Sequence, residues 1–159
     1  MTRSLLALGT AGLLLLLGGC SSSHTTLTAT LTTASPLEAK LEMDVALNDD
    51  GTVSVSARSN LPDGTELGAS VFQEGGFVAQ DPQTLQAGAA AFGPFSDKGQ
   101  PLRSGTYDVS VTMPIARNQP AAVRAIIGAH GENLTGSAVS KDSISGDAVV
   151  TVEEKLVIP

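Results

Sequence analysis

Apolar and polar side chains alternate along a stretch that begins shortly after Pro36. Residues 41–47 carry Leu, Met, Val and Leu at every second position, and residues 53–57 carry Val, Val and Ala in the same way. The sequence Asn48-Asp49-Asp50-Gly51 between them has the composition of a tight turn. A period of two places the apolar side chains on one face of a strand. The pattern therefore predicts two strands joined in a β-hairpin.

Further segments with strand-like patterns follow, separated by residues that favour turns. Asn60–Thr65 contains Pro and Asp-Gly and predicts a second turn, and Ser96–Pro101 predicts a loop. Asp81-Pro82 interrupts the pattern and is interpreted as a break between two strands. Residues 107–113 alternate strictly, which is typical of an antiparallel strand with one face in water. The strands predicted after the hairpin are residues 67–72, 77–80, 84–92, 107–113, 148–152 and 156–158.

Residues 119–128 fit two different elements. Pro120, an alanine-rich composition and apolar residues at helical spacing favour a short helix that ends at Gly128. The apolar stretch Val123–Ile127 also fits a strand. The sequence leaves both interpretations open.

The number and spacing of these segments predict the fold class. Seven or eight short strands, with turn signals about every ten residues and no alternation with long helices, favour an all-β, antiparallel β-sandwich. One short helix near residues 120–127 accompanies it if that segment is helical. About 120 residues follow Pro36, which is enough for one hydrophobic core. We therefore expect a single sandwich domain over residues 37–159.

Two short segments resemble known sandwich domains. The turn Leu61–Thr65, and Gly105–Val109, where a Gly-x-Tyr sequence enters a strand, are similar to bacterial immunoglobulin-like and transthyretin-like domains. The resemblance covers only these residues and implies a sandwich fold, without carrying any functional residue across. The chain has one Cys and no Trp, so it lacks the disulfide and the Trp of antibody-type domains.

The first twenty residues have the order of an export signal. Arg3 provides a positive start, Leu5–Leu17 is almost entirely apolar, and Gly18 and Gly19 precede Cys20. A helix over Leu5–Leu17 would be about 20 Å long, whereas a membrane-spanning helix must cross about 30 Å of hydrocarbon. We therefore expect residues 1–19 to be a signal peptide rather than a transmembrane anchor.

The segment Leu17-Gly18-Gly19-Cys20 resembles the lipobox of bacterial lipoprotein precursors. The resemblance implies that a diacylglyceryl group is attached to the Cys20 thiol and that the chain is cut before Cys20. Ser21 then follows the lipidated residue, which by similarity to enterobacterial lipoproteins implies the outer membrane, facing the periplasm. A secreted protein with an incidental Cys is the alternative. Residues 20–36 are rich in Ser and Thr and predict an extended spacer.

Composition and charge exclude some partners. Nine Lys and Arg residues stand against sixteen Asp and Glu, and loss of Arg3 with the signal would leave eight. The basic residues are spread singly, so no run exists that could neutralise successive phosphates of a nucleic acid. Net acidity also disfavours adhesion to anionic head groups, so membrane attachment should depend on lipid at Cys20. The oligomeric state is left open.

Chemistry-bearing residues are sparse beyond the spacer. His130 is the only histidine there, and Glu132 two positions later could share a metal on one strand face, although no further ligand lies nearby. A surface-loop histidine is the simpler interpretation. The chain has no Gly-x-Ser-x-Gly elbow and the mature chain no Ser-x-x-Lys pair, and Asp142, Asp147, Glu153 and Glu154 are interpreted as solvated charge. We predict no catalytic residue, metal site or cofactor.

The few aromatic residues are clustered in the sequence. Phe72, Phe77, Phe92, Phe95 and Tyr107 all fall between residues 72 and 107. Facing inward, they would supply the bulk of the core, and facing outward they could stack on a sugar or an apolar partner. Phe77 and Phe95 therefore join His130 and Glu132 as candidate ligand-binding residues.

Three functions are compatible with these features. The first is a lipid-anchored, non-catalytic sandwich that binds or supports another envelope component through a sheet edge or the loops at Gly75-Gly76 and Ser96–Pro101. The second is a receptor or chaperone that binds a small ligand or metal near His130 and the aromatic residues. The third, an envelope hydrolase, would need His130 as its base.

Overall fold

The computed structural model describes residues 35–159. The predicted signal peptide, the lipobox with Cys20 and the spacer up to residue 34 lie outside the described residues. The described residues belong to one compact unit.

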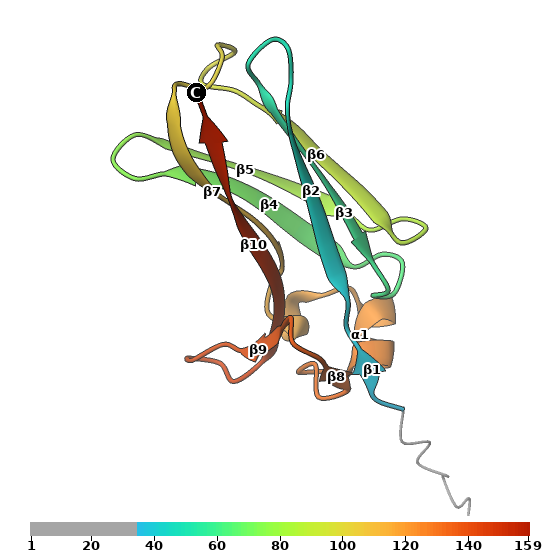
Figure 1. The fold of residues 1–159 in the computed structure, drawn as a ribbon. Coiled ribbons are helices and arrows are strands. Elements are labelled where there is room, and N and C mark those ends of the chain that lie inside the picture. Colours follow the sequence, from blue (N-terminus) through green and yellow to red (C-terminus); the bar gives the residue numbers. More distant parts are fainter. Residues whose placement is uncertain (1–34) are drawn as a thin grey trace, which may run out of the picture. The chain divides into compact units, whose positions relative to one another are not determined.

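Two antiparallel sheets face each other in this unit (Figure 1). One sheet has the strand order β5-β4-β7-β10-β9 and the other the order β2-β3-β6, while β1 and β8 form a separate parallel pair. The prediction of an all-β, antiparallel sandwich is confirmed. The described strands are β1 (Leu37–Glu38), β2 (Leu41–Leu47), β3 (Val53–Ser59), β4 (Glu66–Gln73), β5 (Phe77–Thr84), β6 (Ala89–Phe95), β7 (Gly105–Met113), β8 (Leu134–Thr135), β9 (Val139–Lys141) and β10 (Ala148–Ile158).

The first predicted hairpin is present as β2 and β3. These strands pair antiparallel from Leu41 opposite Ser59 to Leu47 opposite Val53. In the turn, Asp50 Oδ1 accepts bonds from the backbone N–H of Thr52 at 3.0 Å and from its hydroxyl at 2.7 Å. The Thr52 hydroxyl is the main reason that the pKa of Asp50 is lowered. Asp50 therefore stabilises the turn that joins the two strands.

The core is built from the inward positions of the alternating strands. Val53, Val55, Val71, Val109 and Val111 are each at most 2% exposed. At roughly 25 cal/mol per Å² of apolar area, burial of such side chains is the main stabilising contribution to the fold. The buried aromatic residues are Phe92, Phe95 and Tyr107, and the Tyr107 hydroxyl donates to the carbonyl of Arg103 at 2.9 Å.

The predicted break at Asp81-Pro82 is wrong. β5 runs through both residues, with Pro82 opposite Gly68 of β4, and the turn comes later, at Gln86–Ala89. Proline cannot donate to a ladder, but β5 is the edge strand of its sheet and needs partners on only one side. The sequence shows the proline without showing that its strand lies at an edge.

The predicted division of the C-terminal segment is also wrong. β10 is one continuous strand that pairs with β7 from Val150 to Ile158. The polar residues that suggested a break lie within it, Glu153 opposite Ser110 and Lys155 opposite Asp108. Backbone pairing with a central strand holds these residues in the sheet although their side chains are exposed.

The open question at residues 120–127 is answered by a helix. α1 (Ala121–Ile127) buries Val123 and Ile127, which are four residues apart and lie on one face. Gly128 has a φ of 95° and donates its N–H to the carbonyl of Arg124 at 2.9 Å, which ends the helix. A 3-10 turn, η1 (Ala116–Asn118), precedes α1. Neither helical segment of residues 35–159 is long and apolar enough to cross a membrane.

Candidate functional site

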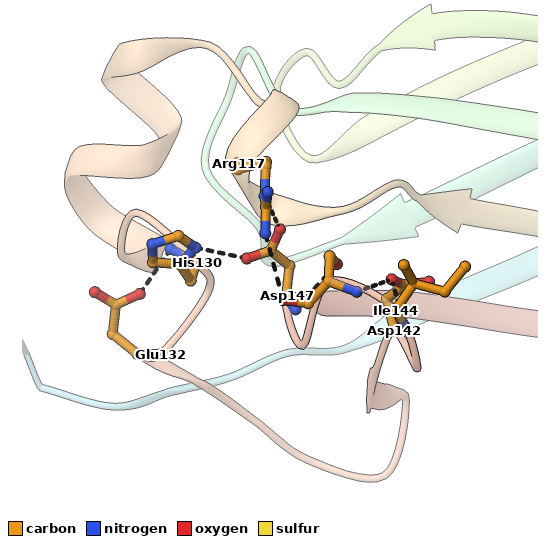
Figure 2. Close-up of polar contacts among 7 residues, drawn as sticks. Arg117, His130, Glu132, Asp142, Ile144 and Asp147 are labelled. Atoms are coloured by element: carbon orange, nitrogen blue, oxygen red, sulfur yellow. Dashed lines mark hydrogen bonds and ion pairs between the residues drawn. The ribbon is translucent and has the colours of Figure 1, made fainter.

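The candidate histidine lies in a polar cluster at the α1 end of the sandwich (Figure 2). His130 belongs to the turn-rich segment between α1 and β8, so it is a loop residue and not on a strand face. Its side chain is 65% exposed, and Nδ1 lies 2.6 Å from Oδ1 of Asp147. One ring nitrogen is therefore engaged with a carboxylate of the protein.

Asp147 is the centre of this cluster. Its side chain is 1% exposed, and the Arg117 guanidinium donates through Nε to Oδ2 while His130 contacts Oδ1. The bond from Arg117 is the largest cause that lowers the pKa of Asp147, with a further contribution from His130. Interpretation of Asp147 as solvated charge is therefore wrong. The fold brings Arg117 from η1 to a carboxylate thirty residues away, which sequence spacing does not reveal.

The loop before Asp147 is held by its own side chains (Figure 2). The carboxylate of Asp142 accepts the backbone N–H groups of Ser145 at 2.7 Å and Ile144 at 3.2 Å. The Ser145 N–H is the main cause that lowers the pKa of Asp142. Arg117 also donates to the carbonyl of Ser145 at 3.3 Å. Both acids of this loop thus serve the local fold.

Glu132 lies close to His130 without facing its ring. Its Oε2 accepts the backbone N–H of His130 at 2.8 Å. Its own backbone N–H is the first cause of its lowered pKa, followed by that of His130. The carboxylate also packs so closely on Gly128 that a Cβ there would collide with it. Within residues 35–159, no three His, Cys, Asp or Glu side chains gather where they could hold a metal ion.

The candidate aromatic residues do not join this cluster or form one groove. Phe95 is 4% exposed and belongs to the core, while Phe77 packs against Tyr107 with ring centroids 6.0 Å apart. Tyr107 lies opposite Leu156, near the end of β10, whereas His130 binds the backbone of Ala148 at its start. The structure therefore separates Phe77 from His130 by most of the length of β10.

A second polar region crosses the outer face of the five-stranded sheet. Two adjoining hollows of about 570 and 500 Å³ share Ser70 and Ser110 in their lining. We call this region the sheet groove. Its floor is formed by residues with small side chains on the central strands β4 and β7. The residues that define the sheet groove are Glu66, Gly68, Ser70, Phe72, Gln80, Pro82, Asp108, Ser110, Thr112, Glu153 and Lys155.

The strand register arranges the groove in rows. Ser70 lies opposite both Gln80 of β5 and Ser110 of β7, and these three form the middle row. In the adjacent row, Gly68 lies between Pro82 and Thr112. Since residues on one face of a sheet follow a period of two, the three-strand rows form one continuous surface.

Gly68 has no conformational or steric need to be glycine. It lies inside β4 without a positive φ, and a Cβ added there would meet no atom within 4 Å. At Gly93, by contrast, φ is 89° and a Cβ would lie 2.8 Å from the backbone nitrogen of Phe95. A glycine inside a strand weakens it, and often marks a place where a ligand or another backbone approaches closely.

The polar groups of the groove have few partners within the protein. Among the described residues, the Ser70 and Ser110 hydroxyls make no hydrogen bond, and Thr112 shares one of 3.3 Å with Thr151. Asp108 and Lys155 form an exposed pair at 2.5 Å. The sequence signal for this site was one glycine in a strand pattern, which sequence analysis did not single out.

Comparison of the chain with protein-family models, curated proteins and solved structures finds no match. The functional assignment therefore depends on the residues of this chain.

Proposed function

We propose that this protein is a lipid-anchored envelope lipoprotein whose non-catalytic β-sandwich binds another envelope component in the sheet groove. A diacylglyceryl group is attached at Cys20, residues 1–19 are then removed, and the lipid holds the domain at the outer membrane facing the periplasm. The apolar segment, the small residues before Cys20 and the Ser/Thr-rich spacer support this part of the proposal.

The observation that carries the binding role is Gly68. A central strand that could hold a side chain at no steric cost instead leaves its outer face open. The open position adjoins hydroxyl groups that make no hydrogen bond within the described residues, which are available to a ligand. The two hollows each have the size of ordinary small-ligand sites.

The polar cluster at the α1 end supports a non-catalytic role. His130 is the only histidine beyond the spacer, and its Nδ1 is engaged by Asp147. Glu132 and Asp142 accept backbone N–H groups. These contacts fasten loops to the sandwich, and we assign them to stability rather than to proton transfer.

The anchor is tested by intact-mass measurement of the protein purified from its host. We expect a chain that begins at Cys20 and carries added diacylglyceryl mass. A Cys20→Ser variant should keep residues 1–19 uncut by the lipoprotein route and lose membrane association. An unmodified Cys20 in the natural protein would overturn the anchor.

Binding is tested by in-cell crosslinking from a photoreactive amino acid placed at Gln80 on the groove rim. We expect a reproducible adduct that disappears when Gly68→Val fills the floor. Ser56→Val is the matched control, since Ser56 is exposed on the central strand of the opposite sheet. An adduct retained in Gly68→Val, or lost equally in both variants, would contradict binding in the groove.

A further inference from the structure

We infer that the component bound in the sheet groove is a saccharide chain that is uncharged or carries amino groups. This inference rests on the proposed function, because it names the ligand of the same site. It follows from the groove's backbone, its hydroxyl groups, its charge and its apolar rim.

The backbone of the floor cannot recognise a ligand. β4 is paired on both sides, with β5 and β7, and β7 is paired on both sides, with β4 and β10. Their N–H and C=O groups are therefore used by the sheet. An extended peptide that binds by adding a strand needs a free edge, so it finds no partners on this floor. Recognition must depend on side chains.

The side chains of the floor match a polyhydroxylated ligand. Ser70 and Ser110 lie side by side on neighbouring strands, with Gln80 beyond one and Thr112 two positions from the other. Each hydroxyl can donate one hydrogen bond and accept two, and the amide of Gln80 can do both. Sugar hydroxyls also donate and accept, so rows of such groups suit them without requiring a fixed charge.

Charge narrows the class of saccharide. Glu66 lies at one end of the groove and Glu153 lies beside the middle row, opposite Ser110 on β10, and neither forms a salt bridge within residues 35–159. The one basic side chain of the lining, Lys155, is paired with Asp108. The uncompensated charge is therefore negative, which disfavours phosphate- or carboxylate-bearing polymers and favours neutral or amino sugars.

The apolar rim and the open floor suit the shape of a sugar ring. Phe72 lies in the row next to that of Ser70 and is 44% exposed. Val78 of β5 lies opposite Phe72 and is 66% exposed. An aromatic face of this kind can pack against the C–H face of a pyranose. Gly68 lies four residues, about 13 Å, along β4 from Phe72, with Ser70 between them. A further sugar of the same chain, beyond the ring at Phe72, can therefore approach the sheet backbone closely at Gly68, which has no side chain.

The test is a calorimetric titration of the full mature lipoprotein in a zwitterionic detergent that carries no sugar. The probes are tetramers of N-acetylglucosamine, of glucosamine and, as the anionic comparison, of galacturonic acid. We expect binding of at least one of the first two, and at least tenfold weaker binding of the galacturonate tetramer. Gly68→Val should weaken binding at least tenfold and Phe72→Ala about threefold or more, with Ser56→Val unchanged.

Ser110→Ala provides a second groove variant that adds no bulk, so the test does not depend on the folding of Gly68→Val. It should weaken binding by about threefold or more. If neither neutral nor amino tetramer binds at millimolar concentration, or the galacturonate tetramer binds equally well, the saccharide inference is overturned. The proposed function survives that result if the Gly68-dependent adduct at Gln80 is still recovered in cells. If the adduct is also absent, both fail.

Discussion

At the α1 end of the sandwich, the Asp147 carboxylate is hydrogen-bonded to Arg117 and His130. In the sheet groove, by contrast, the hydroxyls of Ser70 and Ser110 make no hydrogen bond within the described residues. Both regions are polar and both line the same sandwich. In the cluster around Asp147, the polar atoms are already hydrogen-bonded to one another. In the sheet groove, the serine hydroxyls are free to bind a ligand.

Whether a polar group is already hydrogen-bonded within the protein distinguishes structural residues from ligand-binding residues more reliably than the residue type does. A histidine beside two acids is a typical candidate for a metal or catalytic site, yet here its neighbours hold loops in place. Serine and glycine carry little chemistry of their own, yet the groove they form is the open surface. A polar group is available to a ligand only when the fold does not satisfy it.

The largest loss of thermal stability is expected from Asp147→Ala. The substitution removes the buried carboxylate that joins Arg117 of η1 and the His130 loop to the start of β10, although the Arg117 and His130 side chains themselves remain accessible to water. We expect Tm to fall by about 5 °C or more in a thermal melt. Asp49→Ala, in the exposed turn between β2 and β3, should change Tm by no more than about 2 °C. Equal shifts in the two variants would show that the cluster is not structural.

The second-largest expected effect is a loss of stability at low pH. The pKa of Asp147 is lowered by Arg117, so the folded protein resists protonation of this group more than the unfolded chain does. Its contribution to stability is therefore complete above its ordinary pKa of about 3.9 and is lost as pH falls through the lowered value. We expect Tm to decline below pH 4. Asp147→Asn should decline less steeply over the same range, and identical slopes would contradict this origin.

Gly68→Ala should raise stability, in contrast to the change at Asp147. An alanine Cβ meets no atom there and reduces the conformational freedom of the unfolded chain. We expect a gain of about 0.5–1 kcal/mol in denaturant unfolding. Gly93→Ala is the opposite case, because its positive φ and close neighbours should make the same change destabilising. A loss at Gly68 would mean that glycine is required by the fold after all.

Ser110→Ala should have the smallest effect on stability. Its hydroxyl makes no hydrogen bond within residues 35–159, so its removal should change the free energy of unfolding by less than about 0.5 kcal/mol. The same substitution is expected to weaken ligand binding. A large loss of stability would place Ser110 with Asp147 among the residues that hold the fold together.

Much of the fold was predictable because burial on one face imposes a period of two. The hairpin of β2 and β3 and the central strand β7 follow directly from that pattern. Errors arose where pairing, rather than burial, decides the structure, as at Pro82 on an edge strand and Glu153 on a strand paired with β7. Strands β1 and β8 have two residues each, which is too short to show any period.

The sites were predictable only in part, for a related reason. His130 could be singled out because it is the only histidine beyond the spacer, but its partner is seventeen positions away and Arg117 lies thirty positions from that same carboxylate. Gly68 is visible in the sequence, but its position on the floor of the sheet groove depends on the register that places it between Pro82 and Thr112. Contacts between distant segments are fixed by the fold and leave no local pattern.

The parallel pair of β1 and β8 has a mechanical consequence. The backbone bonds that join them run from Leu37 to Asn133 at 2.7 Å and from Ala39 to Thr135 at 2.8 Å. Tension transmitted through the chain from before residue 35 reaches these bonds before it reaches β2. The next contacts are those of the Asn60 side chain, which holds the carbonyl of Glu38 and the N–H of residue 40 at 2.8 Å each.

We expect the short pair of β1 and β8 to separate under tension while the seven paired positions of β2 and β3 remain intact. Release of residues 37–40 lengthens the free chain by about 13 Å, since an extended residue spans roughly 3.3 Å. The domain can therefore release this length of chain under load, with exposure of Leu37 and Ala39, while the paired strands β2 and β3 still cover the rest of the core.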